Sequence, residues 1–295
     1  MATFILIAVS GLGLGALYFL LATGLSLIFG LMRVLSFAHG AFLSVAAFAS
    51  WLVLRSDDSP STWRLALALL AATVLGGALA FVTELAIIRP LKGRELEQLL
   101  ATVGLGLALV ALLAAIWGPD EHLIPRTQWL DSTSSVLGAP IPHTRFLLIV
   151  AAALVMAAIR LLLSRSRYGL IIRAGVENSE MVSALGINVK RSFTLVFTVG
   201  GMLAGLGGGL AGSYYGGVSP YLGDGMLIFS FIVLIIGGLG SIVGALVAAI
   251  VLGLSQSLVN FYVQNGIGDI FVVVLLVMTL LVRPQGLLGQ KERLV

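Results

Sequence analysis

The sequence predicts an all-α fold, a polytopic transmembrane helical bundle, and three observations support this prediction. Of its 295 residues, 59% are hydrophobic and only 10% are charged, whereas a soluble domain typically carries about 25% charged residues. The apolar residues form long runs, and about 20 apolar residues span the hydrocarbon core of a bilayer as a helix. Backbone polar groups in lipid must be bonded internally, so such runs form helices. We therefore expect residues 1–295 to form a single transmembrane domain with about eight or nine spans.

Nine apolar runs, separated by polar or glycine-rich breaks, are the candidate spans. They cover residues 4–30, 37–54, 65–88, 99–117, 146–163, 193–214, 226–236, 243–262 and 270–282. The first basic residue is Arg33, so the first run lacks the positive segment that precedes a signal-peptide core. We expect this run to be a retained span.

The connections between the runs alternate in charge, which indicates their sides of the membrane. One set is rich in arginine and lysine, and the other is diluted by aspartate and glutamate. The basic set comprises Arg33, Arg89, Lys92, Arg94, Arg165, Arg167, Arg173, Lys190, Arg191, Arg283, Lys291 and Arg293. Arg160 lies inside the fifth run, near enough to its end to snorkel toward this set. Because cytoplasmic loops carry excess Lys and Arg, the N-terminus is predicted outside and the C-terminus in the cytoplasm.

This orientation requires an odd number of crossings, and nine crossings satisfy it. Eight crossings plus a re-entrant segment at 237–244 would place both termini on the same side of the membrane, contrary to the charge pattern, unless another span is miscounted.

A long loop on the basic side, residues 164–192, contains a short amphipathic segment. Its apolar positions recur at helical spacing, and a glycine follows them as a helix stop. Such a helix must rest on the bilayer surface or on a partner protein. Its polar face carries glutamates rather than the Lys and Arg of a membrane-surface helix, which favours a protein. The predicted docking residues are Glu177, Glu180, Met181, Val182, Leu185 and Gly186.

Two breaks between apolar runs are candidates for a substrate path. The chain has 36 glycines, about 12% of its residues, and most of them are explained by close helix packing. Broken or re-entrant helices are expected near residues 33–40 and 237–244, and interrupted helices in two halves of a chain indicate a substrate path. Residues 40–43 also align with 244–247. This similarity indicates either a weak internal repeat or a chance likeness between two apolar segments. The candidate path residues are Ser36, Phe37, His39, Gly40, Gly237, Gly238, Gly240 and Ser241.

The residues that the sequence lacks narrow the class of function. It has no cysteine and only three histidines, so neither a metal site nor a catalytic residue is predicted. Few ionisable residues fall near a span centre, which disfavours a stand-alone secondary carrier. A membrane enzyme is disfavoured because no catalytic cluster is present. The chain also lacks the phosphate loop of an ATPase, so a permease driven by a separate ATPase is favoured.

Several motifs together resemble one family, the permease subunits of branched-chain amino acid ABC importers (LivH type). The similar segments lie in order along nearly the whole chain. They are residues 35–40 (LSFAHG), 89–93 (RPLKG), 101–105 (ATVGL), 168–189, 237–241 (GGLGS) and 282–287 (VRPQGL). Met181, Val182 and Ser183 stand where many relatives carry alanines, which an amphipathic docking helix tolerates.

The resemblance implies partners and a location that composition does not show. The partners would be a second permease of related fold, two ABC ATPase subunits and an extracytoplasmic substrate-binding protein. ATP and Mg would be bound by the ATPases, with no cofactor in this chain. The implied location is the bacterial inner membrane, and the implied substrates are leucine, isoleucine and valine. The family also includes importers of urea and short-chain amides, which remain the alternative. Whether the permease pairs with itself or with a different chain is left open.

Overall fold

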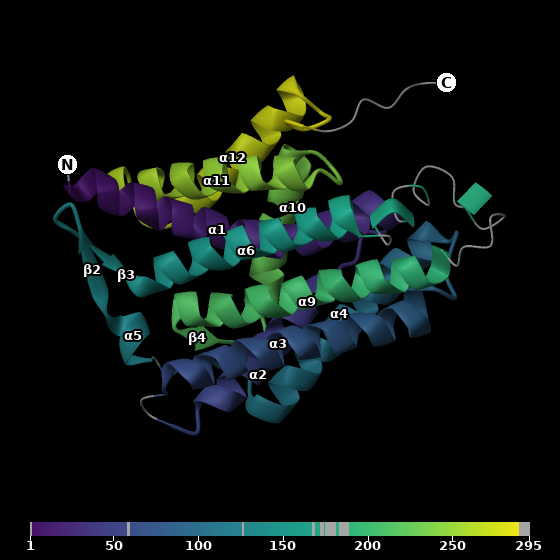
Figure 1. Ribbon diagram of the computed structural model, residues 1–295, viewed down its shortest axis with the longest axis horizontal. Helices are drawn as coiled ribbons and strands as arrows, with labels where there is room; N and C mark the ends of the chain where they lie inside the picture. Colours follow the sequence, from purple (N-terminus) through teal and green to yellow (C-terminus); the bar gives the residue numbers. More distant parts are fainter. Residues whose placement is uncertain are drawn as a thin grey trace.

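In the computed structural model, the described residues are 2–57, 60–125, 127–166, 169–171, 174, 181–182 and 189–288. Each of the nine predicted runs forms a helix in this part of the chain, which confirms the predicted helical bundle (Figure 1). The helices are α1 (Ala2–Met32), α2 (Ala38–Leu54), α3 (Thr62–Thr83), α4 (Glu95–Trp117), α6 (His143–Arg165), α9 (Val189–Tyr215), α10 (Leu222–Gly237), α11 (Ile242–Tyr262) and α12 (Ile267–Val282). A π-helical turn, η1 (Glu84–Ile88), continues α3.

Six of these elements are long and apolar enough to cross a membrane by themselves, and three are shorter. The shorter ones, α2, α10 and α12, have 17, 16 and 16 residues. At 1.5 Å per residue they are about 25 Å long, less than the roughly 30 Å hydrocarbon core. These three helices are therefore too short to span the core alone and need their flanking segments to reach both surfaces.

The small elements between the long helices gather at one end of the bundle. They are the paired strands β1 (His122–Leu123) and β4 (Gly217–Val218), the hairpin of β2 (Thr133–Val136) and β3 (Ala139–Pro142), and the single turn α5 (Gln128–Asp131). Figure 1 shows them at the end where α1 begins. The last turns of α1, η1 and α6 lie at the opposite end (Figure 1).

Glycine contacts set the directions of the long helices. A Cβ on Gly11 of α1 would lie 2.9 Å from Leu254 Cα of α11, and one on Gly15 would lie 2.6 Å from the Ala249 carbonyl oxygen. The two helices therefore run antiparallel at close range. Gly76 of α3 approaches α9 in the same manner. Small residues allow this approach, because packing rather than hydrophobic exclusion holds helices together in lipid.

The start of α1 and the segment after α12 lie at opposite ends of the bundle. The end of α1 meets the turn after α10, since Gly30 Cα would lie 2.7 Å from a Cβ on Gly240. The backbone N–H of Leu287, beyond α12, donates to the Ile236 carbonyl of α10 (2.7 Å). The described chain thus passes between the two ends an odd number of times, as expected for nine passages.

Helix α10 differs from the other helices in its direction. Figure 1 shows it running steeply across the long axis that α1, α6 and α9 share. Its side chains Ile232, Val233 and Ile236 belong to the main apolar core, and Leu234 is fully buried as well. This short apolar helix is therefore surrounded by protein rather than by lipid over most of its length.

Candidate functional site

The first predicted break separates α1 from α2 and is buried against the body of the chain. Helix α1 ends at Met32, Arg33 has a φ of 53°, and α2 begins at Ala38. Ser36 and His39 are fully buried, and neither the Ser36 hydroxyl nor the His39 ring nitrogens have a hydrogen bond of normal geometry among the described residues. The His39 ring packs against α1, where a Cβ on Gly24 would lie 2.8 Å from its Cε1 atom. Unbonded buried polar groups are rare and call for an explanation.

The first turns of α2 hold the start of α10. Gly40 and Gly223 approach so closely that a Cβ on Gly223 would overlap the Gly40 carbonyl oxygen. The Gly223 backbone N–H donates to the Ser44 hydroxyl oxygen (2.8 Å). Further along, the rings of Phe37 and Phe231 lie 5.1 Å apart. The predicted path residues Phe37 and Gly40 are thus in direct contact with α10.

The second predicted break is the turn that ends α10 and begins α11. Gly238 and Gly240 have φ values of 98° and 82°, a region that residues with a Cβ rarely adopt. The Ser241 hydroxyl oxygen accepts from the Gly244 backbone N–H (3.0 Å) and caps α11. The break is therefore a tight turn between two helices.

A segment outside both breaks completes this turn. The backbone N–H groups of Leu287 and Leu288 donate to the carbonyls of Ile236 and Gly237, at 2.7 and 3.1 Å. The last carbonyls of a helix lack partners within the helix, so the tail caps α10. The sequence showed the tail as a family motif and gave no sign of this contact.

Two glycines in equivalent positions hold the two ends of α10. Gly40 is the third residue of α2, and Gly244 is the third residue of α11. Gly40 packs on Gly223 in the first turn of α10, and a Cβ on Gly244 would overlap the carbonyl oxygen of Gly237 in its last turn. The alignment of residues 40–43 with 244–247 thus corresponds to a shared contact in the structure.

The predicted docking segment lies mostly outside the described residues, as do Glu177, Glu180, Leu185 and Gly186. Of the two that are described, Met181 has 63% of its surface exposed and Val182 has 5%. Helix α9 begins shortly after, at Val189.

The start of α9 is bonded to the end of α3. Glu84, with 2% of its surface exposed, accepts a hydrogen bond from the Thr194 hydroxyl (2.8 Å). Lys92 Nζ lies 5.4 Å from the centre of the Phe193 ring. Glu84 lies near the end of the predicted run 65–88, and its partner Thr194 is 110 residues away in the sequence. The structure therefore adds Glu84 and Thr194 to the residues beside the predicted docking loop.

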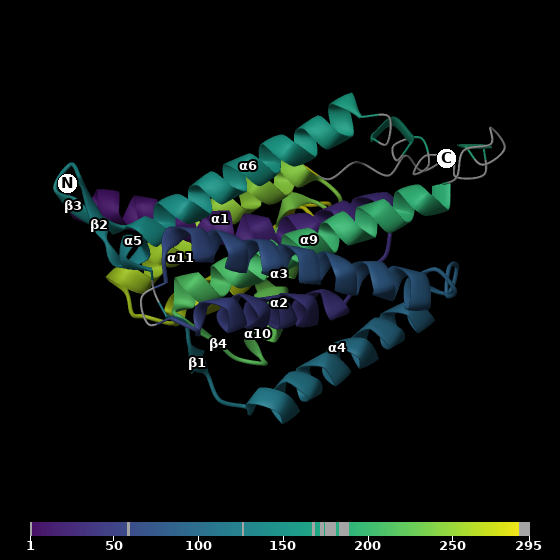
Figure 2. The ribbon, with the colours of Figure 1, turned by 60° about the horizontal axis from the view of Figure 1, so that its bottom comes forward.

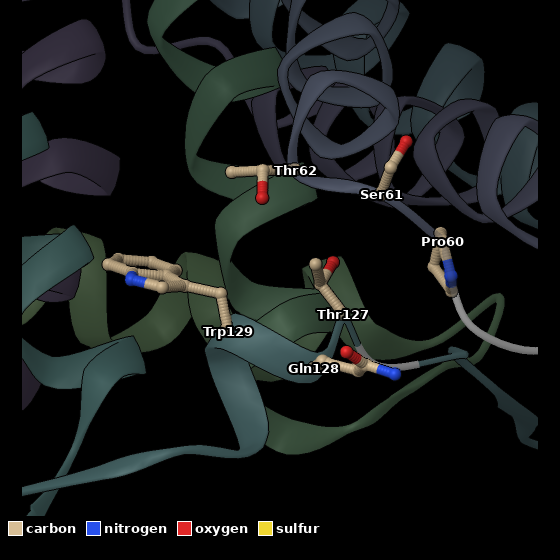
Figure 3. A pocket seen from close by; sticks show the side chains of 6 residues that line it. All are labelled: Pro60, Ser61, Thr62, Thr127, Gln128 and Trp129. Atoms are coloured by element: carbon tan, nitrogen blue, oxygen red, sulfur yellow. The ribbon is translucent and has the colours of Figure 1, made fainter.

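A separate pocket of about 360 Å³ lies at the other end of the bundle. Figure 3 shows its lining, formed by Pro60, Ser61, Thr62, Thr127, Gln128 and Trp129. The residues come from the start of α3 and from the loop that contains α5. No residue predicted for the substrate path or for docking is part of this lining.

These features define a class of protein: a polytopic helical membrane protein in which a short buried helix, α10, is held at both ends by close glycine contacts. The chain belongs to the family of branched-chain amino acid transport system permease components, whose profile matches residues 7–282. It is therefore a multi-pass permease component of a transport system.

Curated relatives of similar length support this assignment. The high-affinity branched-chain amino acid transport system permease protein LivH of Escherichia coli (strain K12) is 29% identical over 291 residues, covering 96% of this chain and 94% of the relative. The permease protein BraD of the same kind of system from Pseudomonas aeruginosa is 30% identical, covering 96% and 95%. The permease protein LivM of E. coli is 26% identical, covering 92% of this chain and 68% of the relative. No solved structure matches this chain.

Proposed function

We propose that this chain is one of two permease subunits of an ATP-driven ABC importer that carries leucine, isoleucine and valine across the bacterial inner membrane. The similarity to LivH and BraD along 96% of the chain carries this proposal. The partner permease is a chain of related fold, since the relatives include LivM as well as LivH. In this chain the N-terminus lies outside and the C-terminus in the cytoplasm.

The chain itself performs no catalysis and binds no cofactor. Two ABC ATPase subunits bind ATP and Mg and hydrolyse the ATP, and an extracytoplasmic binding protein delivers the amino acid. The absence of a phosphate loop in the sequence supports this division of work. Residues 177–186 dock on an ATPase, and Met181, with its large exposed surface, is one of the contacting side chains.

Force from the ATPase reaches the bundle through α9. The docking segment leads into α9, and the Thr194 hydroxyl of α9 is bonded to Glu84 at the end of α3. Because α9 and α3 are in close contact along Gly76, Gly201 and Gly205, the two helices move as one unit. Alternating access then follows from rocking of this unit against α1, α10 and α11.

The substrate path runs beside α10. Both predicted breaks pack on this helix, and the exposed residues Leu239 and Val243 lie in and just after the second one. A path between this chain and its partner permease needs only weak contacts with the amino acid, because the binding protein provides the selectivity.

The test uses the whole complex in nanodiscs. We expect binding protein loaded with leucine, isoleucine or valine to stimulate ATP hydrolysis, and urea or short-chain amides to give no stimulation. Stimulation by urea alone would overturn the choice of substrate.

Gly186→Trp is expected to leave basal hydrolysis intact while abolishing uptake, with Gly225→Ala as the control. Ion-driven uptake by the permease without the ATPases would refute the ABC mechanism.

A further inference from the structure

A second cavity, of about 260 Å³, lies between the last turns of α6 and the first turn of α11. Helix α6 contributes Met156, Arg160, Leu163 and Ser164 to its lining, and α11 contributes Ile242 and Val243. Figure 2 shows the last turns of α6 standing away from the body of the bundle. The volume is close to the lower end of the roughly 300–1,000 Å³ range of small-molecule sites. It is therefore large enough for a small polar group.

The charge in this cavity comes from an arginine inside an apolar helix. Arg160 precedes three leucines and lies five residues before the end of α6 at Arg165. Both ion pairs found among the described residues, Arg64–Asp57 and Arg94–Glu97, lie elsewhere. An arginine on a helix in lipid is costly unless it snorkels to the interface or reaches a counter-charge. The place of Arg160 near the end of α6 allows it to reach the layer of lipid headgroups. The described part of the chain supplies no acidic partner for it.

A hydroxyl lies on the same face of α6 as this arginine. Ser164 follows Arg160 by four residues, which places the two side chains next to each other on a helix, and both line the cavity. The first turn of α11 faces them with Ile242, and a helix start carries partial positive charge. The Arg160 guanidinium and the Ser164 hydroxyl are thus two hydrogen-bond donor groups at this cavity, and the start of α11 adds partial positive charge.

The remaining walls are apolar and open to the surroundings. Met156 lies one turn before Arg160 on α6, and Val243 has half of its surface exposed. A ligand that matches both parts has a negatively charged head and an apolar tail. Basic pockets between transmembrane helices bind the headgroups of anionic lipids by the same combination of forces.

We propose that this cavity binds an anionic phospholipid, with its phosphate at Arg160 and Ser164 and an acyl chain along Met156 and Val243. A lipid fits better than a protein, because a protein occupant would have to bring a buried acidic residue to this one position. The site adjoins the second predicted break, since its two lining residues from α11 directly follow Ser241. Its binding of a lipid does not depend on which solute is carried.

The test is native mass spectrometry of the full-length permease, assembled with its partner subunits and titrated with phosphatidylglycerol or phosphatidylcholine. We expect one phosphatidylglycerol to remain bound under conditions that remove phosphatidylcholine. Arg160→Gln is expected to weaken this binding about tenfold or more, because a charge-assisted hydrogen bond is lost. Arg165→Gln is the matched control, since Arg165 lies on the same helix and does not line the cavity.

A second variant tests the apolar wall without changing any charge. Val243→Trp fills the cavity from α11, so it is expected to displace the lipid even if Arg160→Gln does not fold. Equal binding of the two lipids, or unchanged phosphatidylglycerol binding by both variants, would overturn the proposal. Displacement by millimolar inorganic phosphate would show a soluble-anion site instead. Loss of permease pairing in Arg160→Gln would show a protein interface instead.

Discussion

The contact between α2 and α10 can be tested with a pair of alanine substitutions. In Gly223→Ala the added Cβ overlaps the Gly40 carbonyl oxygen and comes within 2.7 Å of the Ser44 hydroxyl oxygen. Both groups belong to a packed helix, so α10 must move away from α2. In Gly225→Ala, two residues further along the same helix, the Cβ meets no atom within 4 Å. The two variants change the same residue type in the same helix and differ only in this contact.

The structure gives the size of the expected effect. Overpacking in a dense interior costs about 1–3 kcal/mol. Moving α10 also breaks the hydrogen bond from the Gly223 N–H to Ser44, which is worth about 1 kcal/mol. We expect Gly223→Ala to lower the free energy of unfolding by about 2–4 kcal/mol relative to Gly225→Ala. Gly225→Ala itself is expected to be neutral or to stabilise the protein by up to about 1 kcal/mol, because alanine favours a helix more than glycine does.

The assay is thermal unfolding of the purified permease, followed by tryptophan fluorescence, alongside uptake by the reconstituted complex. The expected loss corresponds to a fall in Tm of roughly 3–6 °C for a domain of this size. Uptake is expected to fall as well, since α10 shifts beside the proposed path. Equal Tm values for Gly223→Ala and Gly225→Ala would refute the close contact between Gly223 of α10 and Gly40 of α2.

Three further predictions concern the buried carboxylate, the tail and the orientation. Thr194→Val removes the hydrogen bond to Glu84 and is expected to destabilise the protein by about 1.5–3 kcal/mol. Full additivity in a double-mutant cycle with Glu84→Ala, which removes the acceptor, would contradict a direct bond. Gly286→Ala, at a φ of 76° and with its Cβ 2.6 Å from the backbone of the α10–α11 turn, is expected to loosen the tail, measured as faster hydrogen exchange in that turn. Because the chain has no cysteine, Ser61→Cys should react with an impermeant maleimide in intact cells and Glu95→Cys only after permeabilisation; the reverse pattern would invert the proposed orientation.

Much of the fold could be predicted from the sequence, because lipid allows few solutions. A run of apolar residues in a bilayer must be a helix, so each of the nine runs became a helix with ends close to those expected. The run 146–163, for example, lies within α6, His143–Arg165. A glycine cluster likewise marked the second break, where Gly238 and Gly240 have positive φ values, whereas the first break, residues 33–40, was marked by its polar residues.

The candidate site could be predicted only in part. The sequence marked the residues at the breaks, but hydropathy carries no information about which helix a break touches. Gly40 and Gly223 are far apart in the chain, and their contact depends on the path of α10 across the bundle. The docking residues Glu177, Glu180, Leu185 and Gly186 lie outside the described residues, so their role stays a prediction.

The sequence by itself determined the class of protein, the helices and the places where they are interrupted. These features are local, because each follows from the solvent that a short stretch of chain meets. Only the tertiary structure decided that α10 is held at both ends, that the tail caps it, and that Glu84 meets Thr194. These contacts join residues far apart in the chain, and they form only when glycines let helix backbones approach closely.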